Sequence, residues 1–512
     1  MSIGTAEKSR EKMKDKTDSG SGLAARFGWM LVANGASIGL WLFATAVIVR
    51  LLPVETYGTY RQLFLLYDSL YGLFMLGMST TLSYFIPRLE EKYWLGFLAV
   101  ITTVLTVSGL TMGAGLYVGR SLISASFSNP SLEFGLRWFW LYPVFALSAS
   151  VINGNFLVST GKVKAAACGV VLVAVTAIPA VLVPAIMGLD IGAIAGALVG
   201  ASAMQLLFLL GLAIFLHRRN GFQWPSGMIR SIGAYTLPLV GVIAFGAITT
   251  RIDSYFVSLS LGPEQFAFYA VGARTVPFLD TFIGTAFVTV LPVFSERFGR
   301  ADHDGVLETW HRVIKKLLLV LIPLVGLLSV TARSLIVLLY TETYVLAVAP
   351  FLAYLCVAPL EGLLFREVLQ AAGKTKDLLP AQFLRAGILV CGFIAIRGGQ
   401  LGLVGPAIVY LLAQYGVAFY MLLRVRKVFD LPFGGILPWQ YIGKLLVGTG
   451  IAAAAALTFL RLQMSFGVLG LIGVTVVFIA GFALWGRWSG LVDSDDIELI
   501  KQVFRGWVRS AA

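Results

Sequence analysis

Several ionisable side chains lie inside long apolar stretches of this chain, where they could bind a charged ligand or carry an ion. A charged side chain costs about 2.5–3.5 kcal/mol at the centre of a membrane helix, so each is a candidate functional residue. A guanidinium group suits phosphate oxygens, and a carboxyl group removed from water can hold a proton. The candidates are Arg50, Arg61, Asp68, Arg251, Asp253, Arg274, Asp280, Glu361, Arg366, Glu367 and Arg385.

Arg251 and Arg274 form the first candidate site. A turn near Gly262 would place both residues at the same depth, roughly 16–18 Å from the outer surface. Two like charges at one level predict either a bound anion or carboxylate partners, which would be Asp253 or Asp280. Arg251 and Asp253 are two positions apart and face different sides of a helix, so they are not an automatic pair.

Arg50, Arg61 and Asp68 lie on the first two apolar segments. A turn near Glu55 puts both arginines close to the outer surface, where they either extend a basic cavity or reach the membrane interface. Asp68 is predicted either to couple transport to a proton or cation, or to accept hydrogen bonds from Tyr or Ser hydroxyl groups. Asp280 is a second candidate for ion coupling.

The remaining charges surround a turn near Lys376. Reflection across that turn brings Arg385 near the level of Arg366 and Glu367, roughly one to two helical turns nearer the cytoplasm than Glu361. This arrangement predicts a structural salt bridge.

The elements that would carry these residues are about fourteen apolar segments, each long enough to cross the ~30 Å hydrocarbon core. Composition agrees, because 58% of residues are hydrophobic and 13% are charged, against about 25% charged in soluble domains. We expect an all-α polytopic membrane protein of two pseudo-symmetric six-helix lobes plus two C-terminal helices. The expected spans are 27–51, 60–86, 94–119, 138–158, 165–188, 191–216, 231–258, 266–292, 314–338, 343–372, 378–397, 401–423, 438–460 and 466–486.

The same pattern predicts the domain organisation. Gly188 and Asp190 mark a tight turn between two spans. The end of the chain has apolar residues at helical spacing, which predicts an amphipathic helix on the membrane surface or one packed on the last spans. The expected parts are a disordered basic tail (1–26), an N-lobe (27–216), a linker (217–230), a C-lobe (231–424), two further helices (438–486) and a cytoplasmic tail (487–512).

The distribution of Lys and Arg predicts the orientation. With fourteen spans, one side holds about 27 basic residues and the other about seven, so the positive-inside rule places both termini in the cytoplasm. This asymmetry accounts for the net charge of +13 without nucleic-acid binding. The three cysteines and three histidines lack metal-ligand spacing, so we expect no metal and no cofactor.

A weak internal repeat appears when the chain is shifted by 209 residues. Residues 51–60 (LLPVETYGTY) then align with residues 260–269 (SLGPEQFAFY). Six helices would separate the copies, and an even number preserves orientation. A parallel repeat of this kind is typical of secondary transporters, whose substrate site lies between the lobes.

The repeated segments carry a family resemblance. Residues 50–60 (RLLPVETYGTY), followed by Leu76-Gly77, are similar to the start of the Wzx-type oligosaccharide flippases of the multidrug/oligosaccharidyl-lipid/polysaccharide exporter superfamily. Residues 251–269, 291–296 (LPVFSE) and 368–376 (VLQAAGKTK) continue the resemblance in order. Ala267 departs from the usual Gly, at a position that tolerates small residues.

The resemblance implies a flippase that moves an undecaprenyl-pyrophosphate-linked oligosaccharide across the cytoplasmic membrane by alternating access, for cell-surface polysaccharide biosynthesis. The implied partners are this cargo, membrane lipids, and a polysaccharide polymerase with other assembly proteins. A cation-coupled multidrug exporter of the same superfamily is one alternative. A membrane glycosyltransferase or polymerase is the other, but the longest loop between helices, about 20 residues at 293–313, leaves no room for a catalytic domain.

Overall fold

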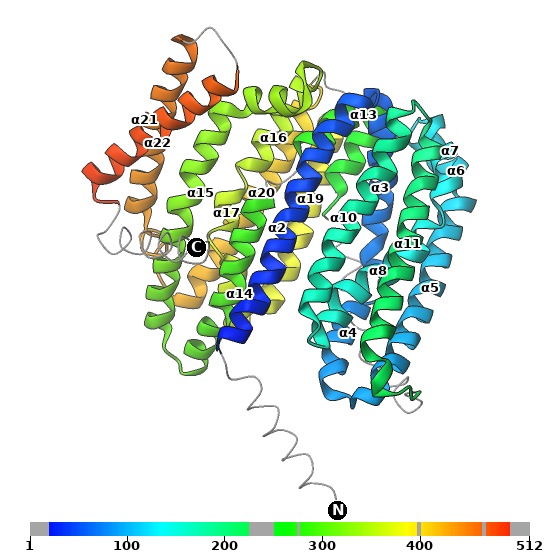
Figure 1. Ribbon diagram of the computed structural model, residues 1–512. Coiled ribbons are helices and arrows are strands. Elements are labelled where there is room, and N and C mark those ends of the chain that lie inside the picture. The colour runs from blue at the N-terminus through cyan, green and yellow to red at the C-terminus, as the bar shows by residue number, and fades with distance from the viewer. Residues whose placement is uncertain (1–19, 225–249, 274–276, 397–400, 463–466, 492–512) are drawn as a thin grey trace, which may run out of the picture. The chain divides into compact units, whose positions relative to one another are not determined.

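The computed structural model describes residues 20–224, 250–273, 277–396, 401–462 and 467–491, and within these ranges the secondary structure is helices joined by turns and short loops (Figure 1). Within these ranges, ten helices are long and apolar enough to cross a membrane, and two bent helix pairs raise the number to twelve. The predicted all-α membrane architecture is therefore confirmed. The other two expected spans, 231–258 and 266–292, lie partly outside the described residues.

Contacts divide the chain into two compact units, Met1–Ala267 (unit 1) and Phe268–Ala512 (unit 2). Unit 1 contains α2 (Gly20–Leu51), α3 (Val54–Phe74), α4 (Met78–Phe85), α5 (Trp94–Val118), α6 (Arg120–Ser126), α7 (Pro130–Phe139), α8 (Tyr142–Val151), the π-helix η3 (Ile152–Phe156), α9 (Leu157–Ser159), α10 (Val163–Ile186) and α11 (Ile191–His217), with short 3-10 turns at η1 (Ile86–Arg88), η2 (Glu91–Tyr93) and η4 (Arg218–Asn220). The unit boundary falls within α13 (Ile252–Gly272). Unit 2 contains α14 (Pro277–Gly299), α15 (His303–Tyr340), η5 (Glu342–Ala347), α16 (Val348–Leu355), α17 (Ala358–Glu361), α18 (Phe365–Ala371), η6 (Thr375–Asp377), α19 (Leu378–Ile396), α20 (Val404–Phe429), α21 (Trp439–Leu462) and α22 (Val468–Ser489).

Two turns that the sequence predicts are present. Gly188, with φ of 66°, separates α10 from α11, and the Asp190 side chain caps α11 by accepting a hydrogen bond from the Ala193 amide at 2.9 Å. Such caps satisfy amides that a helix start leaves without partners. Gly262 has φ of 81° and ψ of 178°, so α13 consists of two helical parts that meet at this glycine. Positive φ favours glycine because it has no Cβ.

The second expected span is bent. α3 and α4 meet at an angle of 43°, at Leu76 (φ 51°) and Gly77 (φ 67°). Two successive left-handed residues cannot continue a right-handed helix. The Leu-Gly pair of the family motif is therefore the break in this span. α7 and the helices from Tyr142 to Ser159 form a second bent pair, at 57°.

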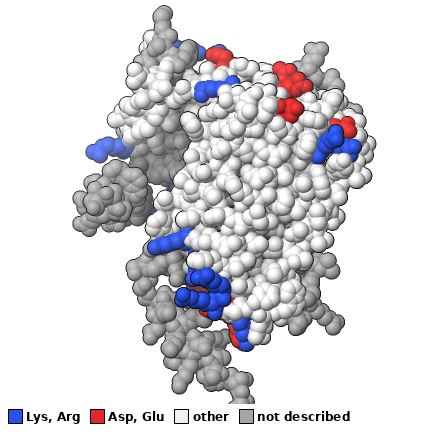
Figure 2. All heavy atoms as spheres, turned by 45° about the vertical axis from the view of Figure 1, so that its right-hand side comes forward, with Lys and Arg blue, Asp and Glu red and all other residues white. Residues whose placement is uncertain are grey.

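The surface of the helices suits a lipid environment. Large apolar side chains such as Leu122 (75% exposed) and Leu207 (71% exposed) point outward. In Figure 2, most charged side chains gather toward the upper end of the face or toward its lower end left of centre, and a broad white band lies between them. In a bilayer such a band faces hydrocarbon, whereas on a soluble protein it would promote aggregation. The chain is a multi-pass membrane protein.

The last two helices pack mainly on each other and on α15. The helices pack closely at two glycines. A Cβ on Gly448 of α21 would lie 2.1 Å from the Trp485 ring of α22, and one on Gly326 of α15 would lie 2.2 Å from Thr449 of α21. Small residues that let helices approach are typical of membrane helix packing.

Candidate functional site

The centre of the candidate site in unit 1 is an ion pair between α3 and the start of α13. Arg251 Nη2 lies 3.3 Å from Asp68 Oδ2, and the two side chains are 38% and 35% exposed. The sequence singled out both residues but offered Asp253 or Asp280 as partners of Arg251. Asp253 is instead buried, at 1% exposure.

Aromatic side chains cover the α3 side of this pair. The ring of Tyr67, next to Asp68 in the chain, lies 4.9 Å from that of Tyr142, and Tyr142 stacks on Phe139 at 4.7 Å. One helical turn away, Tyr71 OH and Ser150 Oγ are 3.1 Å apart. These contacts join α3 to α7 and α8 at the level of Asp68.

A buried polar network joins the same elements nearer their ends. Gln62 donates from Nε2 to Ser258 Oγ at 2.9 Å. Asn129 donates from Nδ2 to Thr59 Oγ1 at 2.9 Å and to Gln62 Oε1 at 2.7 Å. All four side chains are at most 1% exposed. Paired polar groups in an apolar interior fix one relative position of their helices, because breaking them leaves buried groups without partners.

The two motifs that align in the internal repeat also contact each other. A Cβ built on Gly58 would lie 1.9 Å from the Pro263 carbonyl oxygen, so the α3 and α13 backbones meet at this glycine. Gly58 lies one turn before Gln62, and Pro263 lies about one turn after Ser258. The close backbone contact and the polar network thus form one interface.

The remaining binding and coupling candidates of the sequence are Arg50, Arg61, Arg274 and Asp280. Arg50 is in the last turn of α2 and is exposed, whereas Arg61, on the first half of α3, is half-buried. Arg274 lies outside the described residues, and so does the Asp280 side chain, although Asp280 itself belongs to α14. Their binding and coupling roles stay predictions.

Unit 2 contains a polar cavity of about 450 Å³. Its walls come from α14, the α17–α18 region, α19 and α20. Glu361, Arg366, Glu367 and Arg385, which the sequence grouped as a salt bridge, all line it. Gln382 and Gln414 line it too, and sequence analysis missed them. Both glutamines lie inside apolar spans, and a polar amide in such a span would have marked them as candidates.

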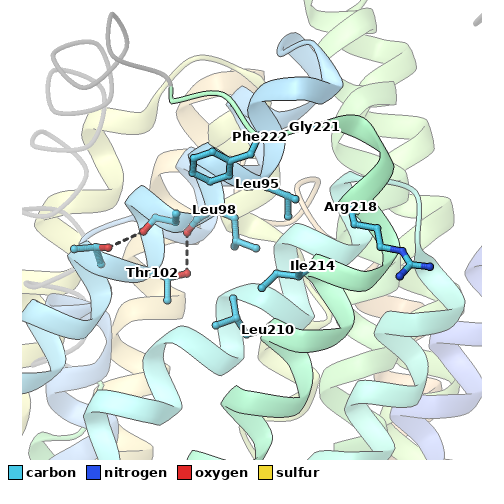
Figure 3. Close-up of a pocket in the computed structure, with 10 residues that line it drawn as sticks. Leu95, Leu98, Thr102, Leu210, Ile214, Arg218, Gly221 and Phe222 are labelled. Atoms are coloured by element: carbon cyan, nitrogen blue, oxygen red, sulfur yellow. Dashed lines mark hydrogen bonds between the residues drawn. The ribbon is translucent and has the colours of Figure 1, made fainter.

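Two cavities of unit 1 have a different character. One of about 580 Å³ lies between α5 and α11, and Figure 3 shows the Arg218 guanidinium pointing away from Leu98 and Ile214 on its walls. The hydroxyl groups of Thr102 and Thr103 bond to carbonyls of their own helix at 2.8 Å. The other, of about 760 Å³, is lined by residues that include Trp138 and Trp140. Apolar walls of this kind favour lipid chains over a polar solute.

The described part of the chain contains no group of three or more His, Cys, Asp or Glu side chains that could together bind a metal ion.

Comparison with known proteins places this geometry in context. Residues 23–298 match the model of a family described as polysaccharide biosynthesis protein. No curated protein matches the chain by sequence.

The fold resembles solved transporters. The lipid II flippase MurJ in an inward closed conformation has a TM-score of 0.64 and 15% identity, with 89% of this chain and 97% of that chain covered. An inward-facing multidrug resistance MATE family transporter of the MOP superfamily has a TM-score of 0.62 and 16% identity, with 77% and 94% covered. A MOP superfamily transporter from Pyrococcus furiosus has a TM-score of 0.56 and 16% identity, with 79% and 95% covered. At these identities the likeness shows a shared fold.

Proposed function

Because this chain belongs to the polysaccharide biosynthesis protein family, we propose that it translocates an undecaprenyl-pyrophosphate-linked oligosaccharide across the cytoplasmic membrane. It works by alternating access and makes or breaks no covalent bond. The fold that it shares with a lipid II flippase supports movement of a lipid-linked substrate.

The observation that carries the proposal is the ion pair between Arg251 and Asp68. Both groups belong to apolar helical surroundings, yet more than a third of each side chain is accessible. A structural pair in such a place would be expected to be packed on all sides, because charges inside a membrane protein are costly. A pair that stays accessible can exchange partners with a ligand.

The cargo and Asp68 compete for the same guanidinium group. Arginine binds carboxylate and phosphate oxygens in the same two-pronged geometry, so pyrophosphate can replace the Asp68 carboxylate at Arg251. Protonation or cation binding at Asp68 removes its attraction for Arg251 and favours this exchange. Release of the proton restores the pair and expels the anion. Asp68 thereby couples an ion to cargo binding.

The cellular setting is part of the proposal. The excess of Lys and Arg on one side of the predicted topology supports cytoplasmic termini in the cytoplasmic membrane. A flippase in this position would pass its cargo to a polysaccharide polymerase and other assembly proteins on the outer face.

A cation-coupled multidrug exporter is the second candidate, and the Asp68 carboxylate would serve it equally well. The helix pair α21–α22 argues against it, because the multidrug transporter structure covers a smaller share of this chain than the lipid II flippase structure does.

Gene deletion tests the proposal. Lipids extracted from cells without the gene should contain an accumulated lipid-linked oligosaccharide that enzymes added outside intact spheroplasts cannot reach. Restoring the gene should clear this pool. Loss of the lipid-linked sugar itself would indicate a biosynthetic enzyme, and altered drug sensitivity with a normal lipid pool would indicate a multidrug exporter.

A further inference from the structure

The polar cavity of unit 2 contains two arginines, Arg366 and Arg385, for which no close ion pair is found among the described residues. Arg385 on α19 is half-buried, and its Nε atom is buried without a hydrogen-bond partner. Among the described residues, no ion pair within 4.0 Å involves Arg385 or Arg366. The salt bridge that the sequence predicts among Glu361, Arg366, Glu367 and Arg385 stays a prediction, and the Arg385 Nε donor is available to a molecule that enters the cavity.

Unsatisfied donors inside a membrane protein are expensive. A buried polar group without a hydrogen bond costs free energy that a hydrogen-bonded group does not, and an arginine in a membrane span adds the cost of its charge. The unpartnered Nε of Arg385 therefore calls for an explanation, and a ligand that enters the cavity during transport would supply one.

The lining selects a class of ligand. Two arginines and two glutamates give the cavity no net formal charge, which favours neither a bare anion nor a bare cation. Guanidinium groups donate, carboxylates accept, and the amides of Gln382 and Gln414 do both. A ligand with many hydroxyl groups matches this set, because each hydroxyl both donates and accepts.

The apolar part of the lining fits the same class. Phe287 and Phe365 offer rings to the C–H faces of a sugar, and the polar groups fix its orientation. The volume of about 450 Å³ lies within the range of small-molecule sites, roughly 300–1,000 Å³.

We propose that this cavity binds an uncharged sugar of the cargo, while the pyrophosphate is held elsewhere by Arg251. The inference rests on the proposed function and adds to it, because it gives unit 2 the recognition of the glycan. Specificity would then arise from the polar side chains of α19 and α20.

Binding of a soluble glycan tests the inference. The probe is the repeat-unit oligosaccharide released by mild acid from the surface polysaccharide of the host, titrated against the purified full-length protein in nanodiscs and followed by saturation-transfer NMR. Wild type should bind saturably. Gln414→Leu and Gln382→Leu, on separate helices, should each bind roughly tenfold more weakly, because each loses a hydrogen bond to the sugar.

The matched control is Gln370→Leu, which changes a half-buried amide on α18 that does not line the cavity and should leave binding unchanged. Equal binding by all three variants, each eluting as folded protein, would overturn the inference. So would saturable binding of sodium or inorganic pyrophosphate with none of the oligosaccharide.

Failure of this inference can be separated from failure of the proposed function. Protein that moves the lipid-linked cargo between leaflets but does not bind the soluble oligosaccharide contradicts the cavity assignment alone. Protein that does neither contradicts both.

Discussion

Arg251 and Asp68 bring opposite charges to 3.3 Å from segments more than 180 positions apart in the chain. Removing either charge alone leaves the other without its partner, so single variants cannot separate a structural pair from a binding site. The double variant can, because it removes both charges at once.

We expect Arg251→Ala to lose at least tenfold in transport, since charge-assisted hydrogen bonds contribute about 1.5–3 kcal/mol. Arg251→Lys should keep partial activity, because lysine preserves the charge but cannot donate two parallel hydrogen bonds as a guanidinium group does. The double variant Arg251→Ala, Asp68→Ala should reach the membrane in normal amounts and remain as inactive as Arg251→Ala. Transport at the wild-type level by this double variant would show that Arg251 serves only to neutralise Asp68. The measurement is clearance of the lipid-linked pool in cells that lack the wild-type gene.

Asp68→Asn keeps the size of the side chain and fixes it in an uncharged form. If Asp68 carries the coupling ion, proteoliposomes with this variant should transport at a rate that no longer responds to an imposed proton or sodium gradient. Glu133→Gln is the control, because Glu133 lies near Arg120 outside the candidate site and the variant should keep the response. A gradient response in Asp68→Asn equal to wild type would assign coupling to another group.

Residue-scale sequence reasoning found both members of this pair but not their pairing. Once the ends of a span are known, the position of a residue along it gives the depth of its side chain in the membrane. Which charges meet depends on the rotation of each helix and on its neighbours, and neither leaves a signal in a single sequence. The same limit applies to Arg366 and Arg385, because their depth alone does not determine whether Glu361 or Glu367 is their partner.

At the scale of elements, the contact of α3 with α13 depends on one missing Cβ. Gly58→Ala would place that atom 1.9 Å from the Pro263 carbonyl oxygen, against backbone that cannot move aside as a flexible side chain would. We expect the variant to be destabilised by about 1–3 kcal/mol and to show a lower thermal midpoint in detergent.

Gly211→Ala is its matched control, because nothing lies within 4 Å of a Cβ at this helical glycine. That variant should be unchanged or slightly more stable, since alanine favours helix. Equal midpoints for Gly58→Ala and wild type would mean that α3 and α13 do not approach so closely.

Helix positions were predictable because hydropathy and turn residues determine them. Gly188 and Asp190 separate α10 from α11 where the sequence predicted a turn, and α2 ends at Leu51, close to the predicted turn at Glu55. The bend at Leu76 and Gly77 was not predicted, because an apolar segment with one glycine still reads as a continuous span.

At the scale of the whole molecule, the alternation of basic loops predicts which ends of the helices face the cytoplasm. Pro130 begins α7 and is exposed, and Asp302 caps α15 and is exposed. In a cysteine-free background, Pro130→Cys should react with a membrane-impermeant maleimide in intact cells, and Asp302→Cys should react only after the cells are opened. Labelling of Asp302→Cys in intact cells would reverse the proposed orientation.

The central claim is that this protein moves a lipid-linked oligosaccharide between leaflets, and reconstitution measures this directly. Purified protein is placed in liposomes with the lipid-linked oligosaccharide isolated from the deletion strain, and a membrane-impermeant glycosidase reports how much cargo faces outward. The account predicts that wild type makes the inner-leaflet pool accessible to the glycosidase within the assay, whereas Arg251→Ala and empty liposomes leave about half of the cargo protected. Protection that is the same with wild type, Arg251→Ala and no protein would contradict it.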